Sequence, residues 1–446
     1  MDSDFAPRRQ TVGNCLVILF LNTLIVTVLH EFRYHAAGGA CTGVRASVWE
    51  AASMPTSMIR TTISLLVIAG CAQQAAAPSA LGPPAPVPFE QAVLNAGNAV
   101  FTTAAAAGQR QTIVIDPLVN GVTGEQSAGT KALATRLTEL ARQRYPSLTI
   151  QPFTASAVAG SPLVMVGTFT PVNAQNQPAG AREAYRFCLA LADLRTGKTV
   201  AKSVARATPT GVDSTPTRVF ADSPAWTEDA SVKGYINTCQ ATKVGDPIPP
   251  AYLDGIVTAS ILNQAMEAYD GGRYREALEL YGNARATPAG DQLRVYNGLY
   301  LTRAKLGQRE QAQSAFGDLV GYGLRNGRLA VKLLFRPAST AFAADTRVSG
   351  DYTMWLSQIA QRSTAAASCL QVTGHTSASG SAALNDRLAT LRAEAVKGRL
   401  EQASPALAGH VVANGQGSQQ PLVGTGADNA TDALDRRVEF KVIPAC

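Results

Sequence analysis

The pattern of apolar and polar positions between residues 110 and 245 predicts a mixed module of strands and helix. Five apolar runs of strand length are bounded by turn residues: 112–115, 148–152, 163–169, 185–194 and 199–205. Between the first two runs, residues 128–144 place Leu133, Leu137 and Leu140 on one helical face. A strand–helix–strand start followed by antiparallel strands predicts an α/β sandwich-like module within an α+β multidomain chain.

A repeat with helical periodicity occupies residues 252–325. Three positions recur 35 residues later with matching character, namely Gly272 with Gly307, Ala277 with Ala312, and Tyr281 with Phe316. The spacing and the residue types resemble two tetratricopeptide repeats, whose period is about 34 residues. Because two repeats bury little core alone, we expect them to dock on a neighbouring domain. Such repeats serve either as a peptide-binding or partner-binding surface or as a structural spacer, and the pattern leaves both open.

The last segment, residues 329–446, alternates between strand and helix patterns. The predicted elements are a strand at 330–335, a helix at 352–361, a strand at 369–373, a helix at 382–400, and strands at 411–414 and 437–443. In the second helix, Leu384, Leu388 and Leu391 recur at i, i+4 and i+7, which predicts an apolar face. The order is that of a β-α-β-α-β domain.

The N-terminal quarter carries an export pattern instead of a folded unit. Residues 58–71 contain Arg60, an apolar core and the run VIAGC, which is similar to a bacterial lipobox ending at the lipidation residue Cys71. Residues 1–57 are then an over-extended or non-native start. If they are native, the apolar run 15–30 is a signal anchor and Cys71 is not processed. Residues 72–109 begin with an Ala/Pro-rich stretch and are predicted to form an extended tether.

Composition and cysteine content limit the possible partners and the cellular compartment of the chain. The net charge of +7 is spread over the chain without basic runs that include aromatic residues, so nothing suggests nucleic acid as a partner. After processing at Cys71 four cysteines remain, an even number that suits an oxidising compartment. Of the three possible connectivities, pairing within each domain predicts Cys188–Cys239 and Cys369–Cys446.

The candidate chemistry lies between Gly374 and Arg392, where a strand leads through a small-residue loop into a helix. The loop and helix contain Gly374-His375-Thr376, Gly380, Asn385, Leu388 and Arg392-Ala393, and Arg436-Arg437-Val438-Glu439 follows near the end of the chain. These residues resemble the OmpA-like peptidoglycan-binding domain. One position departs from the family pattern, because Ser377 stands where the family has an aspartate.

The resemblance implies a site for a zwitterionic diamino acid of the wall stem peptide. Arg392 takes the role of the cation that pairs with the ligand carboxylate, for which a guanidinium is well suited. Ser377 offers the ligand ammonium only a neutral acceptor, roughly half as strong as a charge-assisted bond. Thr376 and Asn385 add neutral hydrogen bonds or hold the loop, and one arginine of the closing pair, Arg437, lines the site.

Other chemistry receives little support from the sequence. The segment GEQSAGTK (124–131) approaches a phosphate-binding loop, but its last three residues are not in the order Gly-Lys-Ser/Thr. His375 has only His410 as a second histidine in this domain, so a hydrogen bond that orients the loop is favoured over a metal ligand. No set of residues typical of an enzyme appears, and we expect no cofactor and no metal.

The sequence therefore predicts an outer-membrane lipoprotein that binds peptidoglycan non-covalently, with the repeats as an adaptor for a periplasmic protein. Ala72, instead of aspartate, after Cys71 implies the outer membrane by resemblance to bacterial lipoproteins. The alternative is a regulator or scaffold for a cell-wall synthase or a secretion complex, in which wall binding is weak or lost. The partner of the repeats and the role of residues 110–245 stay open.

Overall fold

The computed structural model describes residues 83–446 apart from positions 161, 179–181, 337–338, 343–350 and 423–434. The predicted start (1–57), the export signal (58–71), Cys71 and the first part of the tether lie outside the described residues. Among the residues that are described, none of the helices is both long enough and apolar enough to span a membrane.

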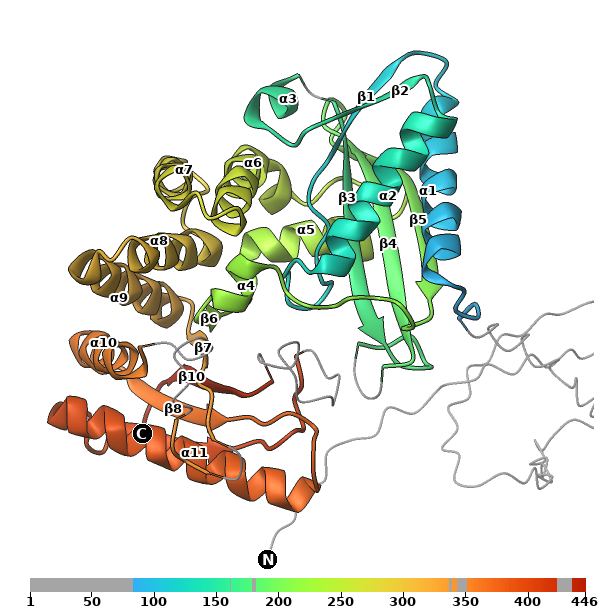
Figure 1. Cartoon of the computed structure of the whole chain (residues 1–446). Helices are drawn as coiled ribbons and strands as arrows, with labels where there is room; N and C mark the ends of the chain where they lie inside the picture. The colour runs from blue at the N-terminus through green and yellow to red at the C-terminus, as the bar shows by residue number, and fades with distance from the viewer. Residues whose placement is uncertain (1–82, 161, 179–181, 337–338, 343–350, 423–434) are drawn as a thin grey trace, which may run out of the picture. The chain divides into compact units, whose positions relative to one another are not determined.

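A five-stranded sheet forms the centre of the first module (Figure 1). Its strands are β1 (Gln111–Ile115), β2 (Leu148–Gln151), β3 (Leu163–Val172), β4 (Ala184–Asp193) and β5 (Lys198–Ala207). They lie in the order β2-β1-β3-β4-β5, with β1 parallel to both neighbours and the last three strands antiparallel. All five predicted strands are present, and the parallel start follows from the crossover helix between β1 and β2.

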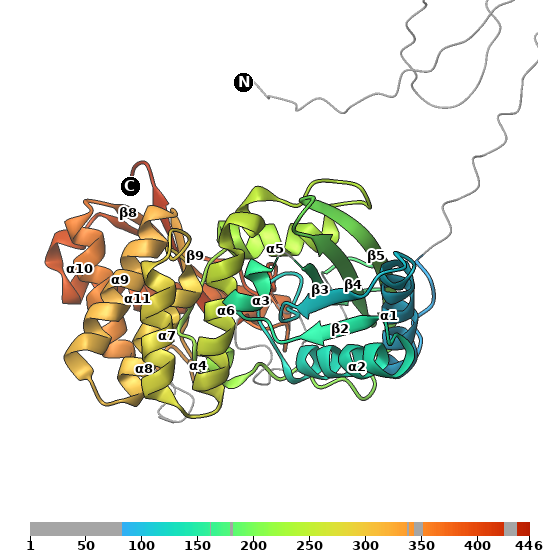
Figure 2. The same ribbon diagram turned by 90° about the horizontal axis from the view of Figure 1, so that it is seen from above.

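Both faces of this sheet are covered, because alternate residues point to opposite sides. Phe187, Leu189 and Leu191 pack with α1 (Phe89–Ala105) and α2 (Ala128–Arg144). Cys188 and Ala190 pack on the other side, against α5 (Ala230–Gln240) and α6 (Pro250–Asp270). The short helix α3 (Ala155–Ala159) adds to that second layer. Figure 2 shows α1 and α2 on one side of the sheet and α5 on the other.

The expected tether over residues 72–109 is wrong for its second half, which forms α1. Val93, Ala96, Val100 and Phe101 recur at helical spacing and are buried. Gly97 brings α1 close to α2, since a Cβ there would lie 2.7 Å from a methyl carbon of Leu140. The alanines in this segment suggested a linker. Alanine is also a good helix former, and the helix is stable here because its apolar face is buried.

Two antiparallel helix pairs follow the first module. They are α6 with α7 (Tyr274–Ala286) and α8 (Leu293–Lys305) with α9 (Arg309–Arg325), preceded by the short α4 (Arg218–Asp222). The repeated glycines, Gly272 and Gly307, both have positive φ (75° and 73°) at the turn between the paired helices. Both members of the repeated alanine and aromatic pairs are buried, so the 35-residue offset marks equivalent structural positions.

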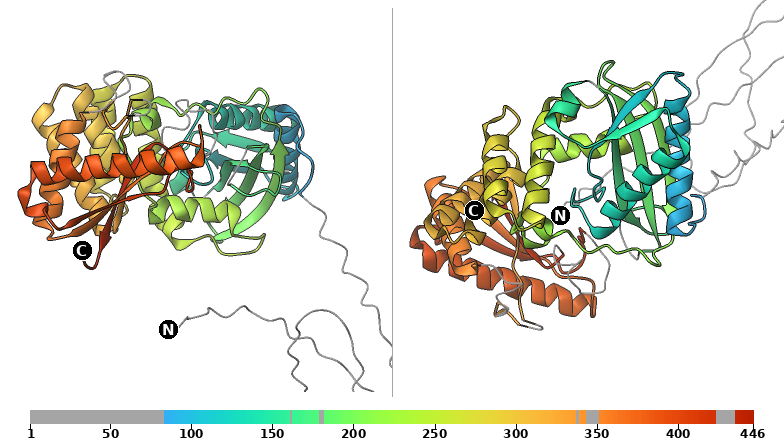
Figure 3. Two further views of the ribbon diagram at one scale, coloured as in Figure 1. Left: turned by 90° about the horizontal axis from the view of Figure 1, so that it is seen from below. Right: turned by 45° about the horizontal axis from the view of Figure 1, so that its top comes forward.

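The C-terminal sheet has the order β6-β7-β10-β8-β9. Its strands are β6 (Ala225–Trp226), β7 (Arg328–Lys332), β8 (Cys369–Gly374), β9 (Val411–Gly415) and β10 (Arg437–Ile443). β10 is antiparallel to both β7 and β8, and β8 is parallel to β9. Helix α11 (Ala382–Ala403) packs on β8 and β9, and α10 (Tyr352–Ala365) and the single turn η1 (Pro405–Leu407) pack against α11 (Figure 3). The predicted β-α-β-α-β order is confirmed, with β6 added from outside the segment.

The helix pairs and the C-terminal sheet share one hydrophobic core. The ring of Trp355 on α10 stacks on Phe316 of α9 at 5.3 Å, and its indole N–H donates to the hydroxyl of Tyr300 at 2.8 Å. β6 belongs by sequence to residues 110–245 but pairs with β7. The expected docking of the repeats on a neighbour is therefore observed, and the boundary at residue 245 does not close the first module.

Candidate functional site

The motif glycines allow the turn from β8 into α11. A Cβ on Gly374 would collide with the backbone carbonyl of Ala389, so only glycine lets the end of β8 lie directly on the helix. Gly380 reverses the chain with φ of +85°, and the side chain of Ser381 then caps α11 by accepting from the amide of Leu384. The glycine spacing recognised in the sequence thus sets the shape of the loop between strand and helix.

Three of the predicted ligand residues hold this loop together and are buried. The amide of Thr376 donates to the carbonyl of Gly417 at 2.8 Å, which fixes the loop to the segment after β9. Asn385 donates from its side chain to the carbonyl of Ser379 at 2.9 Å, and the hydroxyl of Ser377 lies 3.4 Å from that of Ser379. Asn385 therefore orients the loop, and Ser377 belongs to the same hydrogen-bonded group.

Arg392 lies two turns further along α11 and contacts a different segment. Its Nε donates to the carbonyl of Ser339 at 3.2 Å, its Nη2 is 3.4 Å from the carbonyl of Arg336, and its guanidinium lies 4.6 Å from the ring centre of Phe335. The residue is 6% exposed. These contacts hold a planar cation beside the chain that leaves β7.

Arg437 is placed inside the domain in a buried ion pair. It is 1% exposed, its Nε and Nη2 lie 2.8 and 2.7 Å from Oε1 of Glu439, and its Nη1 donates to the carbonyl of Gln420 at 3.1 Å. Arg328 completes the group with two further bonds to Glu439, of 2.9 and 2.6 Å. Burial disfavours the charge of Glu439, but the bond from Arg328 and the charge of Arg437 outweigh it and lower its pKa. Arg437 is thus enclosed in the domain as the partner of Glu439, whereas the sequence predicted that it lines the site.

His375 lies over this ion pair, and its role differs from the one expected. Its backbone amide donates to the carbonyl of Arg437 at 3.0 Å, whereas its ring nitrogens have no hydrogen-bond partner among the described residues. Burial, aided by the charge of Arg437, lowers the pKa of His375 to about 4. The ring is therefore neutral at physiological pH, and the orienting contact comes from the backbone.

The predicted apolar face of α11 is wrong. Leu384 and Leu391 are 54% and 41% exposed, while the buried positions are Asn385, Ala389, Arg392, Ala393, Val396 and Leu400. The buried stripe is offset by one residue because the close approach of Gly374 admits only the small Ala389. The helix therefore directs the polar site residues inward.

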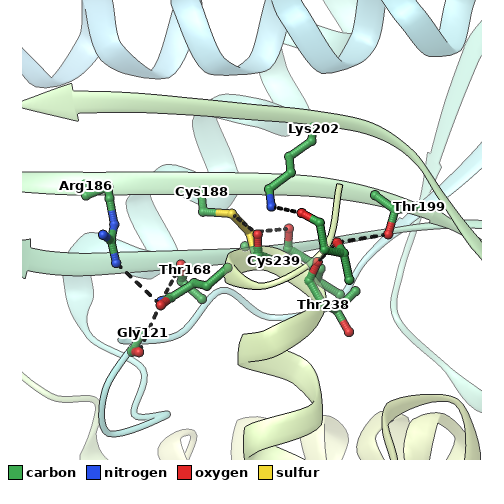
Figure 4. The surroundings of a disulfide bond; sticks show 12 residues. Gly121, Thr168, Arg186, Cys188, Thr199, Lys202, Thr238 and Cys239 are labelled. Carbon is green, nitrogen blue, oxygen red and sulfur yellow. Dashed lines mark hydrogen bonds between the residues drawn. A yellow bond between two sulfur atoms is a disulfide. The ribbon is translucent and has the colours of Figure 1, made fainter. Parts of the chain in front are cut away.

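Both predicted disulfides are confirmed. Cys188 of β4 and Cys239 of α5 join the sheet to its covering helix, with Cα atoms 5.9 Å apart, and Lys202 and Thr199 of β5 make hydrogen bonds to Thr242 beside them (Figure 4). Cys369 and Cys446 tie the start of β8 to the end of the chain, with Cα atoms 5.7 Å apart. The side chain of His410 lies within 4.8 Å of both sulfur atoms, but these sulfurs are engaged in the disulfide.

The segment that approaches a phosphate-binding loop is an ordinary helix start. Ser127 and Thr130 form a capping box, and the next amides, of Ala128 and Gly129, donate to the carbonyls of Thr215 and Asp213. The backbone donors that a phosphate needs are therefore already used.

Sequence reasoning missed a buried acid at the end of β1. The carboxylate of Asp116 accepts a hydrogen bond of 2.8 Å from the hydroxyl of Tyr252 on α6. Burial raises the pKa of Asp116 to about 7, against the opposing effect of that hydrogen bond. In the sequence, an Asp-Pro pair after a strand predicts a turn at the surface. The carboxylate is buried because α6 packs over it, which the sequence does not show.

Comparison with known proteins agrees with the C-terminal assignment. Residues 346–433 match the OmpA family, so this part of the chain is an OmpA family domain. No curated protein matches the chain.

Three solved structures illustrate the structural similarity. They are the cell wall anchor of the T6SS from Pseudomonas aeruginosa (27% identity, 26% of this chain and 80% of that one, TM-score 0.22), the peptidoglycan-associated lipoprotein from Burkholderia pseudomallei (24%, 25% and 88%, 0.21) and the periplasmic domain of Helicobacter pylori MotB (18%, 26% and 74%, 0.21). In each case the similarity covers about a quarter of this chain.

Proposed function

We propose that the C-terminal domain binds peptidoglycan non-covalently through the diamino acid of a stem peptide. The observation that carries the proposal is Arg392, a buried guanidinium that an OmpA family domain holds beside Phe335, Arg336 and Ser339. A ligand carboxylate accepts from the guanidinium, with stronger, charge-assisted bonds than those of the neutral carbonyls of Arg336 and Ser339.

Ser377 limits the strength of this binding in the proposal. The ligand ammonium meets a hydroxyl there instead of a carboxylate, and it loses one charge-assisted bond. Asn385 and the backbone at Thr376 keep the loop in place, which supports a positioning role for them. The proposed role is non-catalytic.

We further propose that Cys71 is lipidated and anchors the chain in the outer membrane, and that the helix pairs act as tetratricopeptide-like adaptors for a periplasmic partner. The basis is the export pattern at 58–71 and the structural equivalence of the two repeats. Labelling with palmitate should depend on Cys71, and cleavage before Cys71 should be sensitive to globomycin. Absence of label would reject the anchor.

Co-sedimentation with purified wall sacculi tests the site. Arg392→Gln should abolish sedimentation while the protein stays folded, and Ser377→Asp should strengthen it by roughly tenfold, the worth of about one added charge-assisted bond. Leu391→Gln, one position away on the exposed side of α11, serves as the matched control and should sediment normally. Unchanged sedimentation of Arg392→Gln would reject the assigned site.

The second candidate is the regulator or scaffold, in which wall binding is weak or lost. The observation that favours it is the combination of Ser377 at the acidic position with the burial of Thr376, Ser377 and Asn385. Failure of the unmodified protein to sediment, together with capture of a synthase or secretion component through residues 252–325, would favour this role.

A further inference from the structure

A basic groove runs over the helix pairs and α10, and it is lined by other residues than the proposed wall-binding site. It encloses about 950 Å³, counted with the solvent at its open side. Four arginines line it, one from each of four helices: Arg285 of α7, Arg303 of α8, Arg325 of α9 and Arg362 of α10. Among the described residues that line the groove, the acidic one is Asp318. The four helices lie side by side in Figure 1.

The ion pairs inside the groove are weak enough to be exchanged. Arg325 and Arg285 share Asp291 at 3.4 and 4.0 Å, and Arg362 lies 3.4 Å from Asp318. The three arginine side chains are between 43% and 59% exposed, and exposed pairs of this kind contribute little to stability.

Arg303 differs from the other three arginines. It has no carboxylate at ion-pair distance within the part of the chain that the structure describes, and its Nη1 is 3.3 Å from the carbonyl of Gln311. A carboxylate from outside can therefore engage it without displacing an acidic partner.

The cations are distributed along the groove. Measured along α9, Arg303 contacts the carbonyl of Gln311, Arg362 lies beside Gly317 and Asp318, and Nη1 of Arg325 lies beside Gly321. The two intervals between these cations are therefore roughly 10 Å and roughly 5 Å at ~1.5 Å per residue. They equal about three and about two residues of an extended or polyproline chain at ~3.1–3.3 Å each.

Between the arginines, the groove is lined by glycine and by apolar side chains. Gly317 and Gly321 of α9 have no side chains, and a Cβ on Gly317 would lie 2.8 Å from Nη2 of Arg362. Leu299 lies beside Tyr296, over which the guanidinium of Arg285 stacks at 5.2 Å. A peptide backbone can thus lie along α9 with apolar contacts below it and guanidinium groups at intervals.

We propose that this groove binds an extended acidic segment of a partner protein, with glutamate or aspartate at every second or third residue. The inference rests on the proposed adaptor role of the helix pairs and names the chemistry of its partner. Three cations spread over about 15 Å suit several carboxylates along one chain better than a single compact anion, which cannot contact all three.

Fluorescence anisotropy tests the proposal with the full chain and a labelled peptide of sequence Glu-Pro-Ala-Glu-Pro-Ala-Glu, amidated at its C-terminus. Binding should weaken as salt increases, and a peptide with glutamine in place of glutamate should not bind. Arg303→Gln and Arg362→Gln should each weaken binding by about two- to fivefold, and the double variant by about tenfold. Arg309→Gln, an exposed arginine of α9 outside the groove, is the matched control and should change binding by less than about twofold.

Equal binding of the glutamine peptide, or equal binding by the double variant, would overturn the proposal. Recovery of the protein on phosphatidylglycerol vesicles through Arg303 and Arg362, without peptide binding, would overturn it in favour of a lipid surface. Sacculus sedimentation and thermal unfolding of the same variants separate the two proposals. If the protein sediments with sacculi but does not bind the acidic peptide, only the proposal for the groove is refuted. If it binds the peptide but does not sediment, only the proposal for the wall-binding site is refuted.

Discussion

The buried pair of Arg437 and Glu439 provides a quantitative test of whether Arg437 supports the site or contacts ligand. Replacing Glu439 by glutamine keeps the shape of the side chain but removes the charge that balances Arg437. Two bonds from Arg437, of 2.8 and 2.7 Å, and two from Arg328 are weakened together. Because Arg437 is 1% exposed, its guanidinium loses the carboxylate that is bonded to it inside the domain, and the nearby charge of Asp435 offsets part of a cost of up to about 3–5 kcal/mol.

The unfolding transition of the C-terminal domain measures this cost. Trp355 reports on it in urea, since its ring lies in the core shared by α9 and α10. We expect Glu439→Gln to move the midpoint strongly to lower urea. The double variant Arg437→Met/Glu439→Leu should recover much of the loss, because it removes both charges. Arg392→Gln should cost about 1–2 kcal/mol, since it gives up the bonds to two carbonyls and the contact with the ring of Phe335.

Sedimentation with sacculi, corrected for the folded fraction, then shows whether Arg437 stabilises the domain or contacts the ligand. If Arg437 is a supporting residue, the folded double variant sediments and Arg392→Gln does not. A Glu439→Gln midpoint within about 1 kcal/mol of the unmodified protein, or loss of sedimentation by a fully folded double variant, would refute this reasoning.

Three further predictions concern the rest of the fold. Burial holds the pKa of His375 near 4 against 6.5 when unfolded, so the unfolded chain takes up the proton first and stability falls as pH decreases from about 6.5 to 4, by up to roughly 3 kcal/mol. Urea titrations at several pH values should show His375→Asn losing this slope, and an equal slope in both proteins would contradict the assignment. Gly374→Ala should destabilise by roughly 2 kcal/mol or more because its Cβ meets the backbone of α11, whereas Gly398→Ala, in open space on α11 itself, should raise the thermal midpoint slightly. Opposite or equal shifts would show that the strand does not lie so close to the helix. Replacing both Cys188 and Cys239 by serine should cost roughly 4 kcal/mol, because the bond closes a loop across 51 residues, and unchanged unfolding would mean that the bond adds nothing to stability.

Local patterns in the sequence were sufficient for most of the elements and for the cysteine pairs. The five strands of the first sheet and the strands and helices of the C-terminal domain follow from apolar runs bounded by turn residues, which act over a few positions. The repeat at an offset of 35 residues and the spacing of Gly374 and Gly380 were likewise visible, because equivalent backbone geometry requires equivalent residues.

Tertiary structure decided what those patterns leave ambiguous. The alanines before residue 105 suit both a linker and a helix, and burial against α2 makes them α1. The leucines of α11 formed the stronger apolar stripe, yet contact between Gly374 and Ala389 turns the neighbouring stripe inward and carries Arg392 with it. Periodicity shows that a helix has faces, whereas only the partner that approaches most closely determines which face is buried.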